Sequence, residues 1–104
     1  MIIDERTYTV RPGTLSAYLK AHMAKALPLM RKYLGEPHGY YTTESGDLNQ
    51  FVHLWHFDSM ADHEVRRAAM YADAAWVAYR ERTGEKDRGL HRYNCILKTL
   101  EVPT

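Results

Sequence analysis

Arg6 and His53 are the side chains in this sequence whose chemical types best suit a reaction. An imidazole can act as a general acid or base near neutral pH, and a guanidinium can hold an oxyanion or a carboxylate. Both residues lie in β-prone segments, where successive side chains point to opposite faces of a sheet. They are therefore the catalytic candidates, on the condition that they share one face. The sequence alone does not fix that register.

Aromatic side chains recur along the chain and could enclose a pocket between a sheet and its helices. Apolar walls with a few convergent polar groups are typical of small-ligand sites. The residues expected to bind a ligand are Arg6, Tyr8, Tyr40, His53, Trp55 and Trp76, with Tyr18 and Tyr79 as further walls. The same residues also fit an ordinary aromatic core, so a pocket and a filled core are alternative interpretations.

Arg6 has a structural interpretation beside the functional one. Asp4, Arg6 and Tyr8 alternate along one predicted strand and share a face. A guanidinium on a covered sheet needs a charged partner, which Asp4 or Glu44 could supply. An ion pair that only ties the sheet together is thus the alternative to ligand binding.

The sequence contains no pattern typical of a metal site. His53 and His56 are three residues apart on a predicted strand, so they point to opposite faces and cannot share one ion. Cys95 is the lone cysteine and has no adjacent histidine. We therefore predict no metal and no cofactor. Haem held by one of the six histidines is the weakest alternative, because one axial ligand suffices.

Length and charge limit the class of protein. The 104 residues fit one domain, 1–104, and 14 basic against 13 acidic residues give a formal net charge of +1. Without clustered Lys and Arg, a nucleic-acid partner is not expected. No apolar run approaches about 18 residues, so no membrane-spanning helix is expected. The lone Cys95 forms no intrachain disulfide, which favours a cytoplasmic location.

The first half of the chain predicts a strand, a helix and a hairpin. Residues 2–10 form the strand, and an apolar stripe with three- and four-residue steps predicts a helix over 15–34. Thr14 can cap this helix, Gly35 can end it, and Pro28 predicts a kink near residues 24–27. Residues 39–43 and 50–57 read as two strands joined by a turn.

The second half predicts a second helix and a last strand. Ser59 opens the helix with Asp62 in a capping box, and Asp73 can divide the helix in two. The residues expected to line its buried side are Val65, Ala69, Ala72, Trp76 and Tyr79. Residues 83–89 look like a polar loop, and 92–102 like a strand. The order βαββαβ predicts a ferredoxin-like α+β fold, a four-stranded antiparallel sheet with both helices on one face.

The third predicted strand is apolar on both faces. Phe51, Trp55 and Phe57 point one way, and Val52 and Leu54 the other. Helices can cover one face, but the other face needs a second cover. A second copy of the chain is the expected cover, because twofold dimers are the commonest assemblies. Coverage by the chain's own C-terminal tail is the alternative.

The chain resembles the NIPSNAP family of the dimeric α+β barrel superfamily. The matching stretches are DERTYTVRPG at 4–13, LPL at 27–29, GYYTTE at 39–44, LNQFVHLW at 48–55, FDSMAD at 57–62, RRAA at 66–69 and WVAY at 76–79. At one position, Glu5, the family more often has an apolar residue. The resemblance implies a homodimer in which two sheets form a barrel.

The resemblance implies no reaction, because the family has no settled biochemical activity. The expected function is a homodimeric small-molecule-binding or interaction module. The alternative is a cofactor-independent monooxygenase or isomerase that acts on a small aromatic or lactone-like compound, since the wider superfamily includes such enzymes and haem-degrading ones. A fold alone transfers none of these activities.

Overall fold

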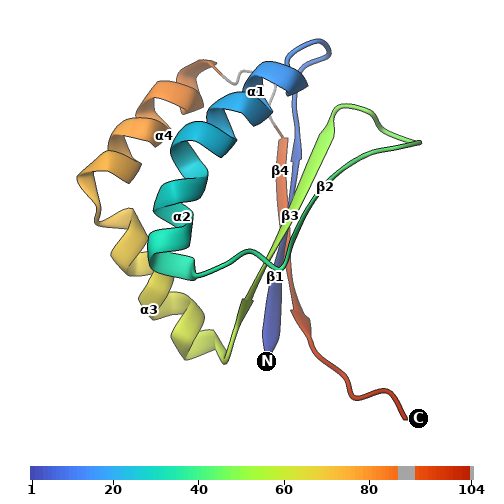
Figure 1. The fold of residues 1–104 in the computed structure, drawn as a ribbon, viewed down its shortest axis with the longest axis vertical. Coiled ribbons are helices and arrows are strands. Elements are labelled where there is room, and N and C mark those ends of the chain that lie inside the picture. The colour runs from blue at the N-terminus through green and yellow to red at the C-terminus, as the bar shows by residue number, and fades with distance from the viewer. Residues whose placement is uncertain (87–90, 104) are drawn as a thin grey trace.

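The computed structural model describes residues 1–86 and 91–103, and for residues 83–86 it describes the backbone alone. Its elements follow the predicted order (Figure 1): β1 (Ile2–Thr9), α1 (Leu15–Ala21), the π-helix η1 (His22–Ala26), α2 (Leu27–Leu34), β2 (Gly39–Thr42), β3 (Gln50–Phe57), α3 (Met60–Tyr71), α4 (Ala74–Lys86) and β4 (His91–Lys98). The four strands pair antiparallel in the order β2-β3-β1-β4. The predicted ferredoxin-like α+β fold is confirmed.

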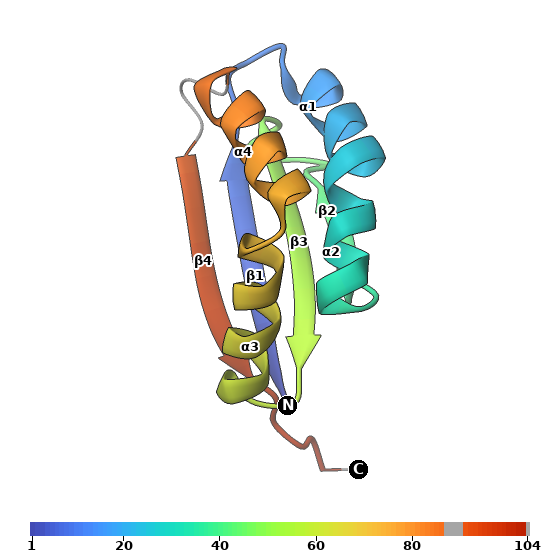
Figure 2. The ribbon, with the colours of Figure 1, turned by 90° about the vertical axis from the view of Figure 1, so that its left-hand side faces the viewer.

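The helices cover one face of the sheet and leave the other bare (Figure 1). In Figure 2, α3 and α4 run in front of β1, while α1, η1 and α2 lie toward β2. The buried core between these layers consists of Ala26, Met30, Leu34, Trp55, Phe57, Met70, Trp76 and Tyr79. Strand β4 forms one edge of the sheet, and most of its residues are exposed.

The predicted kink before Pro28 takes the form of a π-helical segment. The Leu27 N–H donates to the His22 carbonyl, five residues back. Pro28 has no N–H to give, and its ring would crowd the carbonyl of Ala24 in a regular α-helix. The widened turn of η1 accommodates the proline and turns His22 toward the sheet, where it is 3% exposed.

The first helical run begins and ends at the residues predicted from the sequence, Thr14 and Gly35. Gly35 ends α2 at a φ of 83°, a backbone conformation that glycine adopts without strain. Thr14 occupies the N-cap of α1, but its hydroxyl donates to the Arg11 carbonyl at 2.6 Å and accepts no helix N–H. The position of the cap was therefore predicted correctly, and its hydrogen bond was not.

The predicted division of the second helix is confirmed. Asp73 lies between α3 and α4, and its Oδ1 accepts the Ala75 N–H at 2.8 Å. Ser59 caps α3 by accepting the Asp62 N–H at 3.1 Å, while Asp62 accepts the N–H of Asp58 rather than that of Ser59. Helix α4 continues to Lys86, so the loop predicted from residue 83 begins too early. The rest of that loop lies outside the described residues.

The predicted buried side of the second helix is confirmed for Trp76 and Tyr79, which lie in α4, but it is wrong for the first part of that helix, α3. Val65 is 70% exposed, and Ala69 and Ala72 also face outward. The helix instead turns Met70, which is fully buried, and the half-buried His63 and Arg67 toward the sheet. His63 Nε2 lies 3.0 Å from Oδ2 of the fully buried Asp4 on β1. The observed rotation of this helix therefore combines a polar contact between distant parts of the chain with the burial of Met70 in the core.

The bare face of the sheet has a cluster of apolar side chains among polar ones. Paired residues share a face, so the register places on it the apolar side chains Ile3, Tyr41, Val52, Leu54, Tyr93 and Leu97, and the polar side chains Thr7, Thr9, Gln50, His56 and His91. Glu5 lies among them, between Leu54 and Cys95. The C-terminal residues do not cover this face, because they run away from the sheet (Figure 1) with Leu100 77% and Val102 83% exposed. Residues 99–103 therefore do not supply the cover that was the alternative to a second copy.

Candidate ligand-binding site

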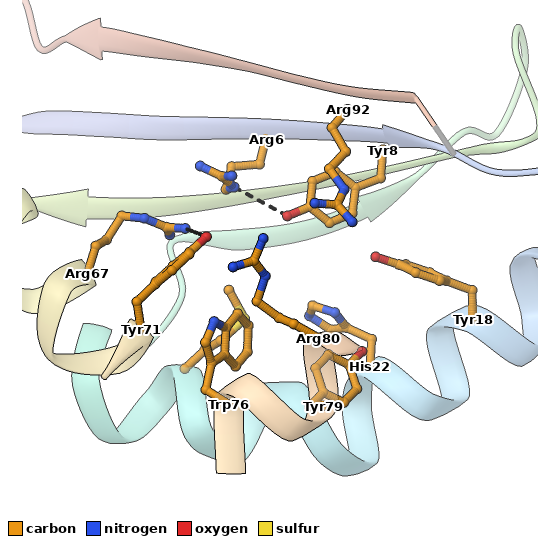
Figure 3. Close-up of a pocket in the computed structure, with 11 residues that line it drawn as sticks. Arg6, Tyr8, Tyr18, His22, Arg67, Tyr71, Trp76, Tyr79, Arg80 and Arg92 are labelled. Atoms are coloured by element: carbon orange, nitrogen blue, oxygen red, sulfur yellow. Dashed lines mark hydrogen bonds between the residues drawn. The ribbon is translucent and has the colours of Figure 1, made fainter. Parts of the chain in front are cut away.

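A cavity of about 50 Å³ lies between the helix-covered face of the sheet and the helices (Figure 3). Residues from seven elements line it: Arg6 and Tyr8 from β1, Arg92 from β4, Tyr18 from α1, His22 from η1, Met30 from α2, Arg67 and Tyr71 from α3, and Trp76, Tyr79 and Arg80 from α4. Four of the described lining residues are arginines, and none is an aspartate or glutamate. The wall is therefore both aromatic and cationic.

The sheet positions Arg6 and Tyr8 through its register. Arg6 pairs with His53 on β3, so the two catalytic candidates do share a face. Tyr8 pairs with Phe51 on one side and with Arg92 on the other. The register that the sequence did not fix is thus known, and Leu54 and His56 lie on the opposite face from Arg6.

Arg6 is held by its neighbours on the same strand. Its Nη1 donates to Asp4 Oδ2 at 3.2 Å, and its Nε donates to the Tyr8 hydroxyl at 3.3 Å (Figure 3). Of the two proposed partners, Asp4 makes the ion pair, whereas Glu44 is exposed. Burial lowers the pKa of Arg6, but Tyr8 and Asp4 outweigh that effect and raise it. The guanidinium therefore stays charged beside the cavity.

Tyr71, at the end of α3, brings two further guanidinium groups together. Arg67 lies 5.1 Å and Arg80 4.7 Å from the centre of the Tyr71 ring, within the range of cation–π attraction. Arg67 Nη2 also donates to the Tyr71 hydroxyl at 2.9 Å. In Figure 3, Arg80 reaches from α4 toward the sheet, and Arg6 and Arg92 face it from the strands. One aromatic ring thus orients two of the four cations.

His22 enters the cavity wall from the π-helical segment. Its Nε2 and the Tyr40 hydroxyl form a hydrogen bond of 2.8 Å. Burial lowers the pKa of His22 to about 4, so the ring is neutral at neutral pH. Burial also raises the pKa of Tyr40. Segments of π-helix are frequent at functional sites, because the extra residue re-aims a side chain.

His53 lies behind the cavity rather than in its wall. It is fully buried, and its Nδ1 accepts the indole N–H of Trp55 at 2.7 Å. Burial, with smaller effects from His22, Arg6 and Arg67, lowers the pKa of His53 to about 2. A neutral, enclosed imidazole is poorly suited to proton transfer with a bound compound at neutral pH.

The structure brings together half of the side chains predicted to bind a ligand. Arg6, Tyr8 and Trp76 line the cavity, as do the predicted walls Tyr18 and Tyr79. Tyr40, His53 and Trp55 stand behind it: Tyr40 bonds to His22, and the other two are fully buried in the layer beneath.

The sequence reasoning missed six lining side chains: His22, Met30, Arg67, Tyr71, Arg80 and Arg92. The spacing of Arg67 with Tyr71 and of Trp76 with Arg80, four residues in each pair, was a usable signal, because such pairs share a helix face. The wrong rotation assigned to α3 concealed it.

Two other kinds of feature are missing from the described parts of the chain. Residues 1–86 and 91–103 hold no group of three or more His, Cys, Asp or Glu placed to bind a metal ion. Among the same residues, no helix has both the length and the apolar character needed to cross a bilayer.

The sheet order and the one-sided helix layer define a ferredoxin-like α+β domain. A family model named NIPSNAP matches residues 3–93. The chain therefore belongs to the NIPSNAP family. The resemblance inferred from the sequence is confirmed, and no specific activity follows from it.

Individual relatives agree with this assignment. The protein NipSnap homolog of Dictyostelium discoideum is 33% identical over 72 residues, which are 69% of this chain and 31% of that protein. The chain thus spans about a third of the length of this curated relative. A protein of known structure from Agrobacterium tumefaciens is 34% identical, with a TM-score of 0.85 over 96% of this chain and 94% of the other.

A more distant structure shares the fold alone. It is a Nitrosomonas europaea protein assigned to antibiotic biosynthesis monooxygenases, 14% identical, with a TM-score of 0.66 over 97% of this chain and all of the other. At this identity the similarity extends to the α+β architecture and not to a reaction.

Proposed function

We propose that this NIPSNAP protein is a homodimer that binds a small molecule between its sheet and its helices. The observation that carries the proposal is the cavity whose wall combines Tyr and Trp rings with four arginines. Arg6 and Arg67 are partly buried, and a filled structural core would not place such charges at an opening, because buried charges need partners. A ligand with an acceptor group and an apolar part matches such a wall.

A second hollow supports the same location. It has a volume of about 320 Å³ and is lined by Val77, Arg80, Glu81 and Arg92, so it shares two arginines with the inner cavity. Ligand sites commonly measure about 300–1,000 Å³. The inner cavity alone is smaller than that range, whereas the two spaces together reach it.

The homodimer is supported by the bare face of the sheet. Tyr41, Tyr93 and Leu97 are 55%, 57% and 40% exposed there, on a face that no described helix covers. Large apolar patches on soluble proteins usually mark an interface. Face-to-face pairing of two sheets would bury this patch and leave the cavity on the helix side of each subunit accessible. The lone Cys95 suits a reducing compartment, and we place the dimer in the cytoplasm.

The enzyme and haem alternatives gain no specific support. A monooxygenase or isomerase that uses His53 needs this ring to meet the substrate, and His53 is enclosed behind the wall. Haem needs a histidine facing a large cavity, whereas His22 faces a space of about 50 Å³ and bonds to Tyr40.

The ligand site can be tested through its indole groups. Trp55 donates its N–H to His53, whereas Trp76 lines the cavity. In ¹H–¹⁵N spectra of the wild-type protein, a panel of phenol, benzoate, phenyl sulfate and phenyl phosphate is titrated to millimolar concentration. At least one compound is expected to move the Trp76 indole signal saturably and leave that of Trp55 in place. A Trp76→Phe variant assigns the signals. If no compound moves the Trp76 signal, ligand binding in this cavity is refuted.

The dimer can be tested by light scattering after gel filtration. The wild-type chain is expected to have twice the 12.1 kDa mass of one copy. Leu54→Glu places a second carboxylate beside Glu5 on the bare face and is expected to lower the mass toward one copy. Val65→Glu makes the same chemical change on the opposite side of the molecule and is expected to leave the dimer intact. A wild-type mass of one copy contradicts the proposed dimer.

A further inference from the structure

We propose that the cavity binds the phosphoryl group of a phosphate monoester, a class of ligand that rests on the proposed function and narrows it. The charge of the wall gives the first reason. The described lining residues include four arginines and no aspartate or glutamate; Asp4 pairs with Arg6 from outside the cavity, and Glu81 lies beside Arg80 and Arg92 in the adjoining hollow. The excess of guanidinium groups over carboxylates in the wall favours a ligand that carries more than one negative charge.

The hydrogen-bonding groups of the wall give the second reason. Trp76 is 7% exposed, and its buried Nε1 has no partner among the described residues; the same holds for the buried Nη1 of Arg67. Both are donors, and neither can accept a hydrogen bond. Figure 3 shows the indole nitrogen of Trp76 facing the space between Tyr71 and Arg80. A ligand group made of acceptors alone, such as an oxyanion, satisfies both donors at once.

The directions of the donors distinguish a phosphoryl group from a carboxylate. A carboxylate is planar and is best met by one guanidinium in the same plane. Here the donors come from different elements: Arg6 from β1, Arg67 from α3, and Trp76 and Arg80 from α4. Donors that converge from several sides match three oxygens in a tetrahedral arrangement. The cationic wall also attracts a dianion more strongly than a monoanion.

The volumes of the two spaces suit the two parts of a phosphate monoester, its phosphoryl group and its body. At about 10–15 Å³ for each water-sized occupant, the inner cavity has room for about three to five oxygen-sized atoms, the size of a phosphoryl group. The body of the ester would extend into the larger hollow beside Val77, past Arg80 and Arg92, which line both spaces. Inorganic phosphate would fill only the inner cavity.

The test compares the affinities of four anions by titration calorimetry on the wild-type protein in chloride buffer. Phenyl phosphate is expected to bind at least tenfold more tightly than phenyl sulfate, which has the same shape and one negative charge, and than benzoate. It is also expected to bind more tightly than inorganic phosphate, and in ¹H–¹⁵N spectra it is expected to move the Trp76 indole proton downfield as a new hydrogen bond forms. Equal binding of phenyl sulfate, benzoate or inorganic phosphate would overturn the phosphate-ester assignment. The proposed function would survive that result, because it requires only that some compound reach Trp76.

Neighbouring arginines on α3 supply a matched pair of variants. Arg67→Gln removes a lining guanidinium and is expected to weaken phenyl phosphate binding at least tenfold. Arg66→Gln makes the same charge change one residue away, where the side chain is 43% exposed, pairs with Asp62 and does not line the cavity. This control is expected to change the affinity less than twofold. Equal losses in the two variants would show attraction to net charge alone and would overturn the site.

Discussion

Acid is expected to destabilise this protein well above the pH at which its carboxylates titrate, because two buried histidines stay neutral in the folded state. The pKa of His22 is lowered to about 4, and that of His53 to about 2, chiefly by burial. In the unfolded chain both rings titrate near a pKa of about 6.5. Below that pH the unfolded state binds protons that the folded state excludes.

The sign and size of the effect follow from proton linkage. A histidine whose folded pKa is lowered contributes stability that is complete above pH 6.5 and is lost as the pH falls toward the folded value. Each such ring lowers the unfolding free energy by about 1.4 kcal/mol per pH unit in that window. Because the unfolded rings are only half protonated at pH 6.5, two rings together remove about 3 kcal/mol between pH 6.5 and 5. A domain of this size typically has about 5–15 kcal/mol in total.

The assay is urea unfolding at pH 7.5, 6.5 and 5, at one protein concentration and in chloride rather than phosphate buffer. Hydrogen bonds from Arg66 and Tyr33 lower the carboxyl pKa values of Asp62 and Asp73, respectively, so those groups contribute stability above about pH 3.8 and lose it only below. The chosen window excludes them. His22→Gln is expected to halve the dependence on pH, since one titrating ring remains.

His38→Gln is the matched control, because the side chain of His38 is exposed and its backbone N–H bonds to Leu54 independently of the ring. It is expected to keep the wild-type dependence on pH. If the wild-type unfolding free energy changes by less than about 1 kcal/mol between pH 7.5 and 5, the buried rings do not act as linkage requires. An unchanged pH dependence in His22→Gln would likewise contradict the role of that residue.

Two further predictions concern the packing and the start of α3. Met70→Ala removes a fully buried side chain and is expected to cost about 2–5 kcal/mol of unfolding free energy. Val65→Ala, on the exposed side of the same helix, is expected to stay within about 0.5 kcal/mol, and the reverse ranking in urea unfolding would refute the observed rotation. Ser59→Ala removes the hydroxyl that caps α3 and is expected to cost about 1 kcal/mol, whereas Ser59→Asp, which restores an acceptor, is expected to recover most of it.

The strands and helices were predictable because each follows a short period in the sequence. Alternation over residues 50–57 correctly separated Phe51 and Trp55 from Val52 and Leu54, since that rule depends on one strand alone. The pairing of Arg6 with His53 was not predictable, because register depends on two strands that meet only in the folded chain.

The rotation of α3 shows where a local pattern misleads. Apolarity favoured Val65 as the buried residue, but the structure buries the stripe formed by His63, Arg67 and Met70. His63 reaches Asp4, which is 59 residues away in the chain. A helix pattern read by itself contains no information about such a partner, so the polar contact outweighed apolarity without leaving a signal in the local sequence.

The residue of α3 that breaks the apolar pattern by turning inward, Arg67, also lines the candidate site. Leaving a buried donor such as Arg67 Nη1 without a protein partner costs about 1–3 kcal/mol, and an apolar residue there would avoid that cost. Natural sequences are mostly consistent from local pattern to global fold, and departures concentrate at functional sites. Arg67 turns inward because α3 rotates toward Asp4, and Tyr71 then orients Arg67 and Arg80 together. The departure of α3 from the apolar pattern therefore brings Arg67 to the cavity, and a ligand that satisfies its unpaired donor would offset the cost of burying it.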